Sequence, residues 1–247
     1  MQRNDRIGRA ALGLVAACAF AGGAHAGGLH DVDVILSVEE GAIVTSRVSG
    51  PGGATEPSQL FSANMTLFFG FPFTEDPGFQ SRLSAFPSGS LMRLNMLDAL
   101  RVWENGNFDS VAALPLEIEF GMISYFSSST PGMLVTGPTF SVTPLGDVHV
   151  HPFHYLDPNA EDGLYLMQFE IESNAAIDTT APFFWIYDWN ASAADLAAAQ
   201  EWVRSNLLMD PCPADLDGEG VVAAGDLATL LGSWGAGGGG GPADFDD

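Results

Sequence analysis

The chain of 247 residues carries 31 acidic side chains against eight basic ones, a formal net charge of −23 at pH 7. A protein this acidic is repelled by nucleic acids and by anionic membrane surfaces, and the composition argues against both as partners. Divalent cations are the partners that such a charge favours. Solubility in a salty exterior explains the bulk charge equally well.

The first 26 residues have the three parts of a secretory signal peptide. Three arginines precede residues 10–20, an apolar stretch shorter than the about 20 residues that a membrane span needs. An Ala-His-Ala cleavage pattern follows at 24–26, so we expect an exported mature chain that begins near Gly27. A retained anchor is the alternative. The localisation is therefore expected to be periplasmic, cell-surface or extracellular, with no membrane span in the mature chain.

Cleavage would also change the composition of the chain. It would leave five arginines, no lysine and 30 carboxylates. Cys18 would leave with the signal, and Cys212 would remain as the single cysteine. No disulfide could then form within the mature chain.

Residues 27–209 are enough for one sizeable hydrophobic core and rather few for two domains. Short runs along this stretch alternate apolar and polar residues, as at Val32, Val34 and Leu36, and clusters rich in Pro, Gly, Ser and Asp separate them. Period-two alternation is typical of half-buried strands. The sequence therefore predicts an all-β domain, an antiparallel β-sandwich of jelly-roll type.

Histidines gather near the middle of the domain, where three of the four that follow residue 26 lie close together. Residues two apart in a strand face the same way, so Asp147, His149 and His151 are expected on one outer face. The valines between them should point inward. The proline that follows breaks the strand and could let His154 turn toward the other two imidazoles.

Neutral imidazoles favour zinc, copper, nickel or iron over calcium. The sequence therefore predicts a transition-metal site made by His149, His151 and His154. Asp147 or His30 would supply the fourth ligand. A solvent-exposed pair of histidines without a metal is the alternative.

One helix is expected at the end of the sandwich, docked on its edge. Ser192 can cap its first turn, with Asp195 three residues later. Apolar residues then recur at helical spacing on one face, at Leu196, Ala199, Val203 and Leu207.

A calcium-loop motif follows in residues 210–247, after a Pro-Cys-Pro linker. A hard cation needs oxygen ligands at loop positions 1, 3 and 5, a backbone carbonyl at position 7 and a carboxylate at position 12. The residues at these positions are Asp215, Asp217, Glu219, Val221 and Asp226. Gly220 supplies the turn at position 6, and an apolar helical pattern follows the loop.

The words PADLDGEGVVAAGDLATLLGSWG resemble half of a type I dockerin, because Asp226 closes the loop and a helix is expected only after it. The resemblance implies calcium binding and a cohesin-like or cell-surface partner. The motif restarts at Pro242, so a second repeat is expected to be truncated. Ala223 leaves one ligand position to water. Weak or absent calcium binding and a merely acidic, flexible tail are the alternatives.

Residues 28–208 resemble a family of exported bacterial proteins placed under the zinc uptake regulator. The words that carry the resemblance include LHDVDVILSVEEGAIVT, FPSGSLMRLNML, ALRVWENGNF, DVHVHPFHYL and PFFWIYDWN. It implies a non-enzymatic surface or extracellular protein tied to zinc supply, with the histidine-rich strand as the source of ligands. Members of this family often carry a C-terminal sorting segment, so a dockerin-like tail leaves the manner of attachment open.

Two other classes of function remain. A mononuclear metal-dependent hydrolase could recruit Glu161 or Asp162 as its base, but the spacing that a cupin requires and the Gly-x-Ser-x-Gly elbow are both missing from the sequence. A carbohydrate-binding or scaffold component of a polysaccharide-degrading assembly could use Trp103, Trp185 and Trp189 to stack on sugar rings. Aromatic residues in a sandwich are more often part of the core.

Overall fold

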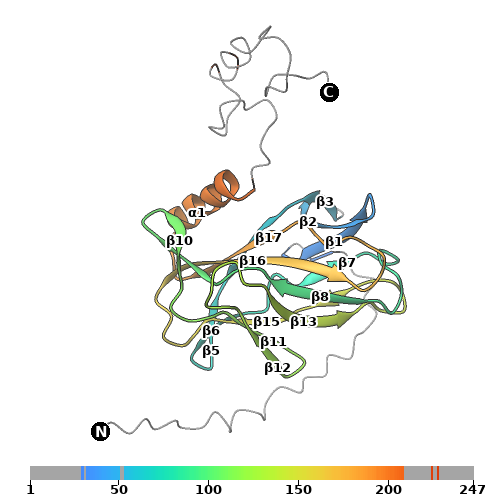
Figure 1. Ribbon diagram of the computed structural model, residues 1–247, viewed down its shortest axis with the longest axis horizontal. Helices are drawn as coiled ribbons and strands as arrows, with labels where there is room; N and C mark the ends of the chain where they lie inside the picture. Colours follow the sequence, from blue (N-terminus) through green and yellow to red (C-terminus); the bar gives the residue numbers. More distant parts are fainter. Residues whose placement is uncertain (1–28, 31, 51–52, 209–223, 225–226, 228–247) are drawn as a thin grey trace.

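The computed structural model describes residues 29–30, 32–50, 53–208, 224 and 227. These residues form a stack of β-sheets with one helix on one side (Figure 1). Within the described part of the chain, no helix has both the length and the apolar character that crossing a bilayer requires.

Three sheets make up the domain. The first sheet runs in the order β14 (His149–Val150), β7 (Phe79–Ser81), β1 (Val34–Glu39), β2 (Ala42–Gly50), β3 (Ala54–Pro57). The second runs β10 (Asn107–Val111), β9 (Arg101–Glu104), β16 (Gly163–Ser173), β17 (Phe183–Trp189), β4 (Leu60–Asn64), while β8 (Leu91–Met96) joins β16 to β13 (Val135–Ser141). The third runs β12 (Ile123–Phe126), β11 (Glu117–Phe120), β15 (Phe153–Tyr155), β6 (Phe71–Thr74), β5 (Thr66–Phe68).

The second sheet lies between the helix on one side and the other two sheets on the other, and apolar side chains cover both of its faces. Along β17, Trp185 and Tyr187 enter the main core, while Phe184 and Ile186 enter a smaller core beneath the helix. The first and third sheets close the other side of the main core, for example through Phe79 and Ile118. Strands buried on both faces read as continuous apolar runs, as β17 does.

The helix α1 (Ala193–Asn206) covers the smaller core. Ser192 is its N-cap and accepts a hydrogen bond from the Asp195 backbone N–H at 3.1 Å, as the sequence predicts. Ala199 and Val203 are buried against the second sheet. Leu207 differs from the expectation, since it caps the C-terminus of the helix and is exposed.

A mostly β, sandwich-like domain with one helix at its end is thus confirmed. Pairing between the described strands is antiparallel except for β1 with β7 and β4 with β17, which are parallel. Both exceptions join strands that are far apart in sequence, where a short turn does not impose antiparallel pairing. The predicted signal peptide at 1–26 and nearly all of the tail at 210–247 lie outside the described residues.

Candidate metal centre

The first sheet brings the ends of three strands together at its β14 edge. β7 lies between β14 and β1, with His149 opposite Gln80 and Val34 opposite Phe79. The segment just before β1 folds over the same edge, because the backbone N–H of His30 donates to the side-chain oxygen of Gln80 at 2.8 Å. Residues distant in sequence therefore converge on one spot.

Four side chains meet there, and each offers one ligand atom within 4.8 Å of the other three: His30, Asp33, His149 and His151. Oδ2 of Asp33 lies 3.3 Å from Nδ1 of His30 and 3.8 Å from Nε2 of both other imidazoles. The two Nε2 atoms of His149 and His151 are 3.1 Å apart. A tetrahedral zinc ion with bonds of about 2.0–2.1 Å sets neighbouring ligand atoms about 3.3 Å apart, close to these distances.

Asp33 forms the floor of this group. Its side chain is fully buried, and its Oδ1 accepts a hydrogen bond from the Gly78 backbone N–H at 2.9 Å. Oδ2 accepts no hydrogen bond from any residue that the structure describes. A buried carboxylate oxygen without a partner costs free energy, and a cation between it and the imidazoles would remove that cost.

Backbone atoms orient His151 for ligation. Its Nδ1 lies 3.1 Å from the carbonyl oxygen of Glu75. Because a carbonyl only accepts, Nδ1 carries the proton and Nε2 keeps its lone pair toward the other ligands. Gly78 gives the ring its space, since a Cβ there would stand 2.7 Å from ring atoms of His151.

The surroundings of His149 favour its uncharged form. Burial lowers the pKa of His149, and the nearby His151 lowers it further, while the Asp33 carboxylate acts in the opposite direction. Metal ligation requires the neutral ring. His149 is therefore in the ligating form at neutral pH.

Exposure rises from the floor to the rim of the centre. The side chain of Asp33 is 0% exposed, that of His151 26%, that of His149 40% and that of His30 51%. An ion at the floor would thus be reached from solvent past the imidazoles. Three imidazoles and one carboxylate suit zinc and its neighbours among the transition metals, whereas calcium prefers an all-oxygen shell.

His154 does not join this group. The chain leaves the first sheet after β14 and enters the third sheet at β15, where His154 faces the main core. Its ring is fully buried, and Nδ1 lies 2.6 Å from the hydroxyl of Tyr187. The proline at 152 separates two strands of different sheets, so it does not return His154 to the other imidazoles.

Asp147 is not part of the group either, and its carboxylate accepts a hydrogen bond from the hydroxyl of Thr143. The valines beside these histidines were expected to point inward. Val148 is buried as expected, whereas Val150 is only partly buried. His149, His151 and His30 are the predicted ligands that the structure brings together. The five predicted calcium ligands lie outside the described residues: Asp215, Asp217, Glu219, Val221 and Asp226.

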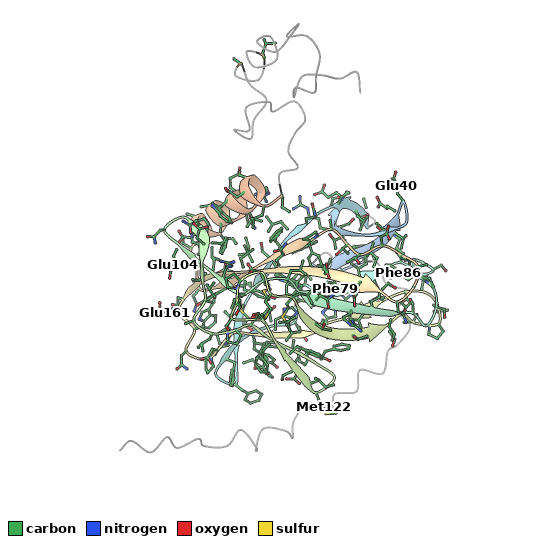
Figure 2. All side chains as sticks on the ribbon, in the orientation of Figure 1. Glu40, Phe79, Phe86, Glu104, Met122 and Glu161 are labelled. Carbon is green, nitrogen blue, oxygen red and sulfur yellow. The ribbon has the colours of Figure 1, made fainter. Side chains whose placement is uncertain are left out.

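Residues suggested by the two alternative functions lie elsewhere. Glu161 is exposed at an edge of the molecule, away from the β7 residue Phe79 that neighbours the centre (Figure 2). Asp162 accepts a hydrogen bond from the Asn190 side chain at 2.9 Å. The three tryptophans named for sugar stacking are wholly or partly buried in the two cores: Trp103, Trp185 and Trp189.

Asp33 is the candidate ligand that the sequence alone did not indicate. Asp33 lies directly before the first strand, between Val32 and Val34. The alternation of apolar and polar residues there gives it a polar, outward position, so its burial is not apparent from the sequence. The spacing His-x-x-Asp from His30 was the available signal, since both residues lie at the mouth of a strand.

Comparison with known proteins identifies no family for this chain. No protein-family model matches the chain, and no curated protein is detectably similar to it in sequence. A proposal for the function therefore rests on the geometry of the four candidate ligands.

Proposed function

We propose that this protein acts outside the cytoplasm and binds one transition-metal ion, zinc in the first instance, in a role in metal handling. His30, Asp33, His149 and His151 hold the ion. The observation that carries the proposal is Oδ2 of Asp33, which is buried, lacks a hydrogen-bond partner among the described residues and faces three imidazoles.

Two further features support a handling role rather than a purely structural ion. The imidazole ligands are partly exposed, so an ion can enter and leave without unfolding of the sheet. The resemblance of residues 28–208 to exported proteins under the zinc uptake regulator points in the same direction. The proposed export rests on the signal-peptide pattern of the first 26 residues.

Zinc titration of the mature protein tests the proposal. The wild type should bind one equivalent, and His149→Ala combined with His151→Ala should weaken binding by at least about 1000-fold, because half of the ligand set is lost. Asp147→Ala is the matched control, since it removes a carboxylate beside His149 that is not in the group. Equal zinc affinity in the wild type and the double variant would contradict the proposal.

The C-terminal loop is proposed as a second, independent site for calcium that serves attachment or assembly. Changing Asp215 and Asp226 together to alanine removes ligands from both ends of the loop. Calcium titration by calorimetry should then lose its heat signal, while zinc binding at the imidazole centre should stay unchanged. The same calcium heat in the variant and the parent would show that the loop is not a site.

A further inference from the structure

The third sheet carries aromatic side chains on the face turned away from the core. Burial alternates along β6 and β15, so Pro72, Thr74 and His154 are buried while their neighbours point outward. A water-facing antiparallel sheet normally carries polar residues at such positions. We name as the aromatic face the outward residues Phe68, Phe71, Phe73, Phe153 and Tyr155.

Their rings form a connected layer. The ring centroid of Phe73 lies 5.0 Å from that of Phe68, 5.5 Å from that of Phe153 and 5.1 Å from that of Tyr155. Phe69 extends the layer at the β5–β6 turn, where it is 73% exposed and has a φ of 48°. Phe69 and Gly70 both have positive φ, as a two-residue turn between paired antiparallel strands requires.

Carboxylates flank the aromatic face. Glu117 pairs with Tyr155 and Glu119 with Phe153 across the β11–β15 ladder, and the buried Ile118 between them shows that both glutamates point outward. Burial raises the pKa of Tyr155 to about 12, and the charges of Glu119, Glu117 and Glu75 contribute to the rise. The negative potential therefore acts on the aromatic rings themselves.

No described cation compensates this charge. The arginines of the described chain each bind elsewhere, at Glu56, the Gly53 carbonyl, Glu172, Asp98 and Glu201. None of these partners lies on the third sheet. The aromatic face thus combines half-buried aromatic rings and the exposed Phe68 with uncompensated negative charge.

A cleft of about 190 Å³ opens at the β11 side of this face. Phe71, Tyr155 and Phe126 give it aromatic walls, and Glu117 and Asp157 supply carboxylates. Aromatic rings beside carboxylates attract cationic side chains, because the ring face and the carboxylate are both negative. The cleft has room for one large side chain.

We propose that the aromatic face, with its flanking Glu117 and Glu119, docks a basic, apolar segment of another protein. Charge complementarity selects this occupant: an apolar side chain covers the rings while lysine or arginine meets the carboxylates. A second copy of this chain is disfavoured, because both copies would bring the same carboxylates to the interface. An anionic membrane surface is repelled by the same charges.

Model peptides of about 14 residues test the proposal on the full mature chain. The first peptide consists of Leu and Lys in an amphipathic pattern. In the second peptide Gln replaces every Lys, and in the third Gln replaces every Leu. Fluorescence anisotropy at about 0.15 M salt should show binding of the Leu/Lys peptide, and affinities at least about tenfold weaker for the other two. Peptide binding is independent of zinc, so failure here leaves the metal proposal untouched.

Matched variants locate the binding. The double variant Glu117→Gln with Glu119→Gln should weaken binding of the Leu/Lys peptide about tenfold. The control variant Glu39→Gln with Glu40→Gln removes the same amount of charge at the exposed β1–β2 turn. It should change the affinity for the peptide less than about twofold. Glu40 lies on the opposite side of the molecule from the β11–β12 turn at Met122 (Figure 2). Phe68→Ser should also weaken binding, whereas Leu83→Ser, an exposed leucine outside the third sheet, should not.

Three outcomes would overturn the proposal. Equal losses in the two glutamate pairs would mean that net charge alone attracts the peptide. Absence of Leu/Lys binding to the folded wild type would leave the face without its proposed ligand. Binding of neutral oligosaccharides such as cellohexaose that is lost in Phe68→Ser, without peptide binding, would assign the face to sugars instead.

Discussion

Zinc should raise the thermal unfolding midpoint of the wild-type protein by about 10 °C, and Asp33→Asn should abolish this shift while making the metal-free protein more stable. A ligand at about 1000 times its dissociation constant adds about 4 kcal/mol to the free energy of unfolding. For a domain of this size, each kcal/mol corresponds to about 2–4 °C. The shift arises because ligands from separate chain segments come together only in the folded state.

The opposite signs of the two effects follow from the surroundings of Asp33. Asparagine keeps an oxygen for the Gly78 N–H but replaces the unpartnered Oδ2 with an amide NH2 group. This group can donate a hydrogen bond to Nδ1 of His30, which lies 3.3 Å from Oδ2. Removing a buried, unpaired acceptor should stabilise the metal-free protein by about 1 kcal/mol. The same change removes the only negatively charged ligand of the group.

Differential scanning calorimetry with zinc and with a chelator measures both effects. Asp76→Asn is the control, because Asp76 is largely exposed and contacts His151 at the other ring nitrogen. Its Oδ1 lies 3.4 Å from Nδ1 of His151, whereas Nε2 of His151 faces the candidate metal site. This control should keep the zinc shift. A zinc shift of wild-type size in Asp33→Asn would show that the carboxylate is not a ligand.

Period-two alternation allowed the β-sandwich to be predicted, and the cap and apolar spacing allowed the helix to be predicted. These features depend on neighbours in sequence, as when Ser192 meets the N–H of Asp195. The choice of sheet for each strand depends instead on distant contacts. β14 and β15 are separated by only two residues yet belong to different sheets, and no local pattern at Pro152 specifies this.

For the candidate site, too, the sequence predicted what depends on neighbouring residues and not what depends on long-range strand pairing. His149 lies in β14 and His151 directly follows this strand, so their spacing alone places them together. Asp33 and His30 reach them only because β7 pairs with both β1 and β14, which is a long-range arrangement. The burial of Asp33 and the loss of a partner for its Oδ2 are properties of the assembled sheet and have no counterpart in local sequence.

Acid should destabilise the folded domain through His154, even though this residue does not belong to the metal centre. Burial lowers the pKa of His154 from 6.5 to about 3. Burial also raises the pKa of Tyr187, so the phenol keeps its proton and donates to Nδ1 of His154. The imidazole is thus neutral, with its remaining proton on the buried Nε2, and its ring packs near those of Trp185 and Phe169.

The sign of the effect follows from proton binding. Between pH 6.5 and about 3 the unfolded chain binds a proton at this histidine and the folded chain does not, so the free energy of unfolding falls as the pH falls. The loss is about 1.4 kcal/mol per pH unit, and about 4–5 kcal/mol once the pH is below both pKa values. Above pH 6.5 His154 contributes no pH dependence.

Comparison with His154→Gln isolates this contribution. Glutamine can still accept a hydrogen bond from Tyr187 but does not titrate, so its unfolding free energy should fall by about 3 kcal/mol less than that of the wild type between pH 7 and pH 4.5. Urea unfolding in the presence of a chelator measures the difference without any contribution from bound metal. His149, whose pKa is also lowered, contributes equally to both proteins.

Tyr187→Phe separates burial from hydrogen bonding. It removes the donor to Nδ1 but leaves His154 buried, so the variant should be about 1 kcal/mol less stable at neutral pH and should keep the pH dependence of the wild type. Identical pH dependence in the wild type and in His154→Gln would mean that His154 takes up its proton at the same pH in the folded and unfolded states. It would then have to face water rather than Trp185, and the packing between the second and third sheets would have to differ from the arrangement in Figure 1.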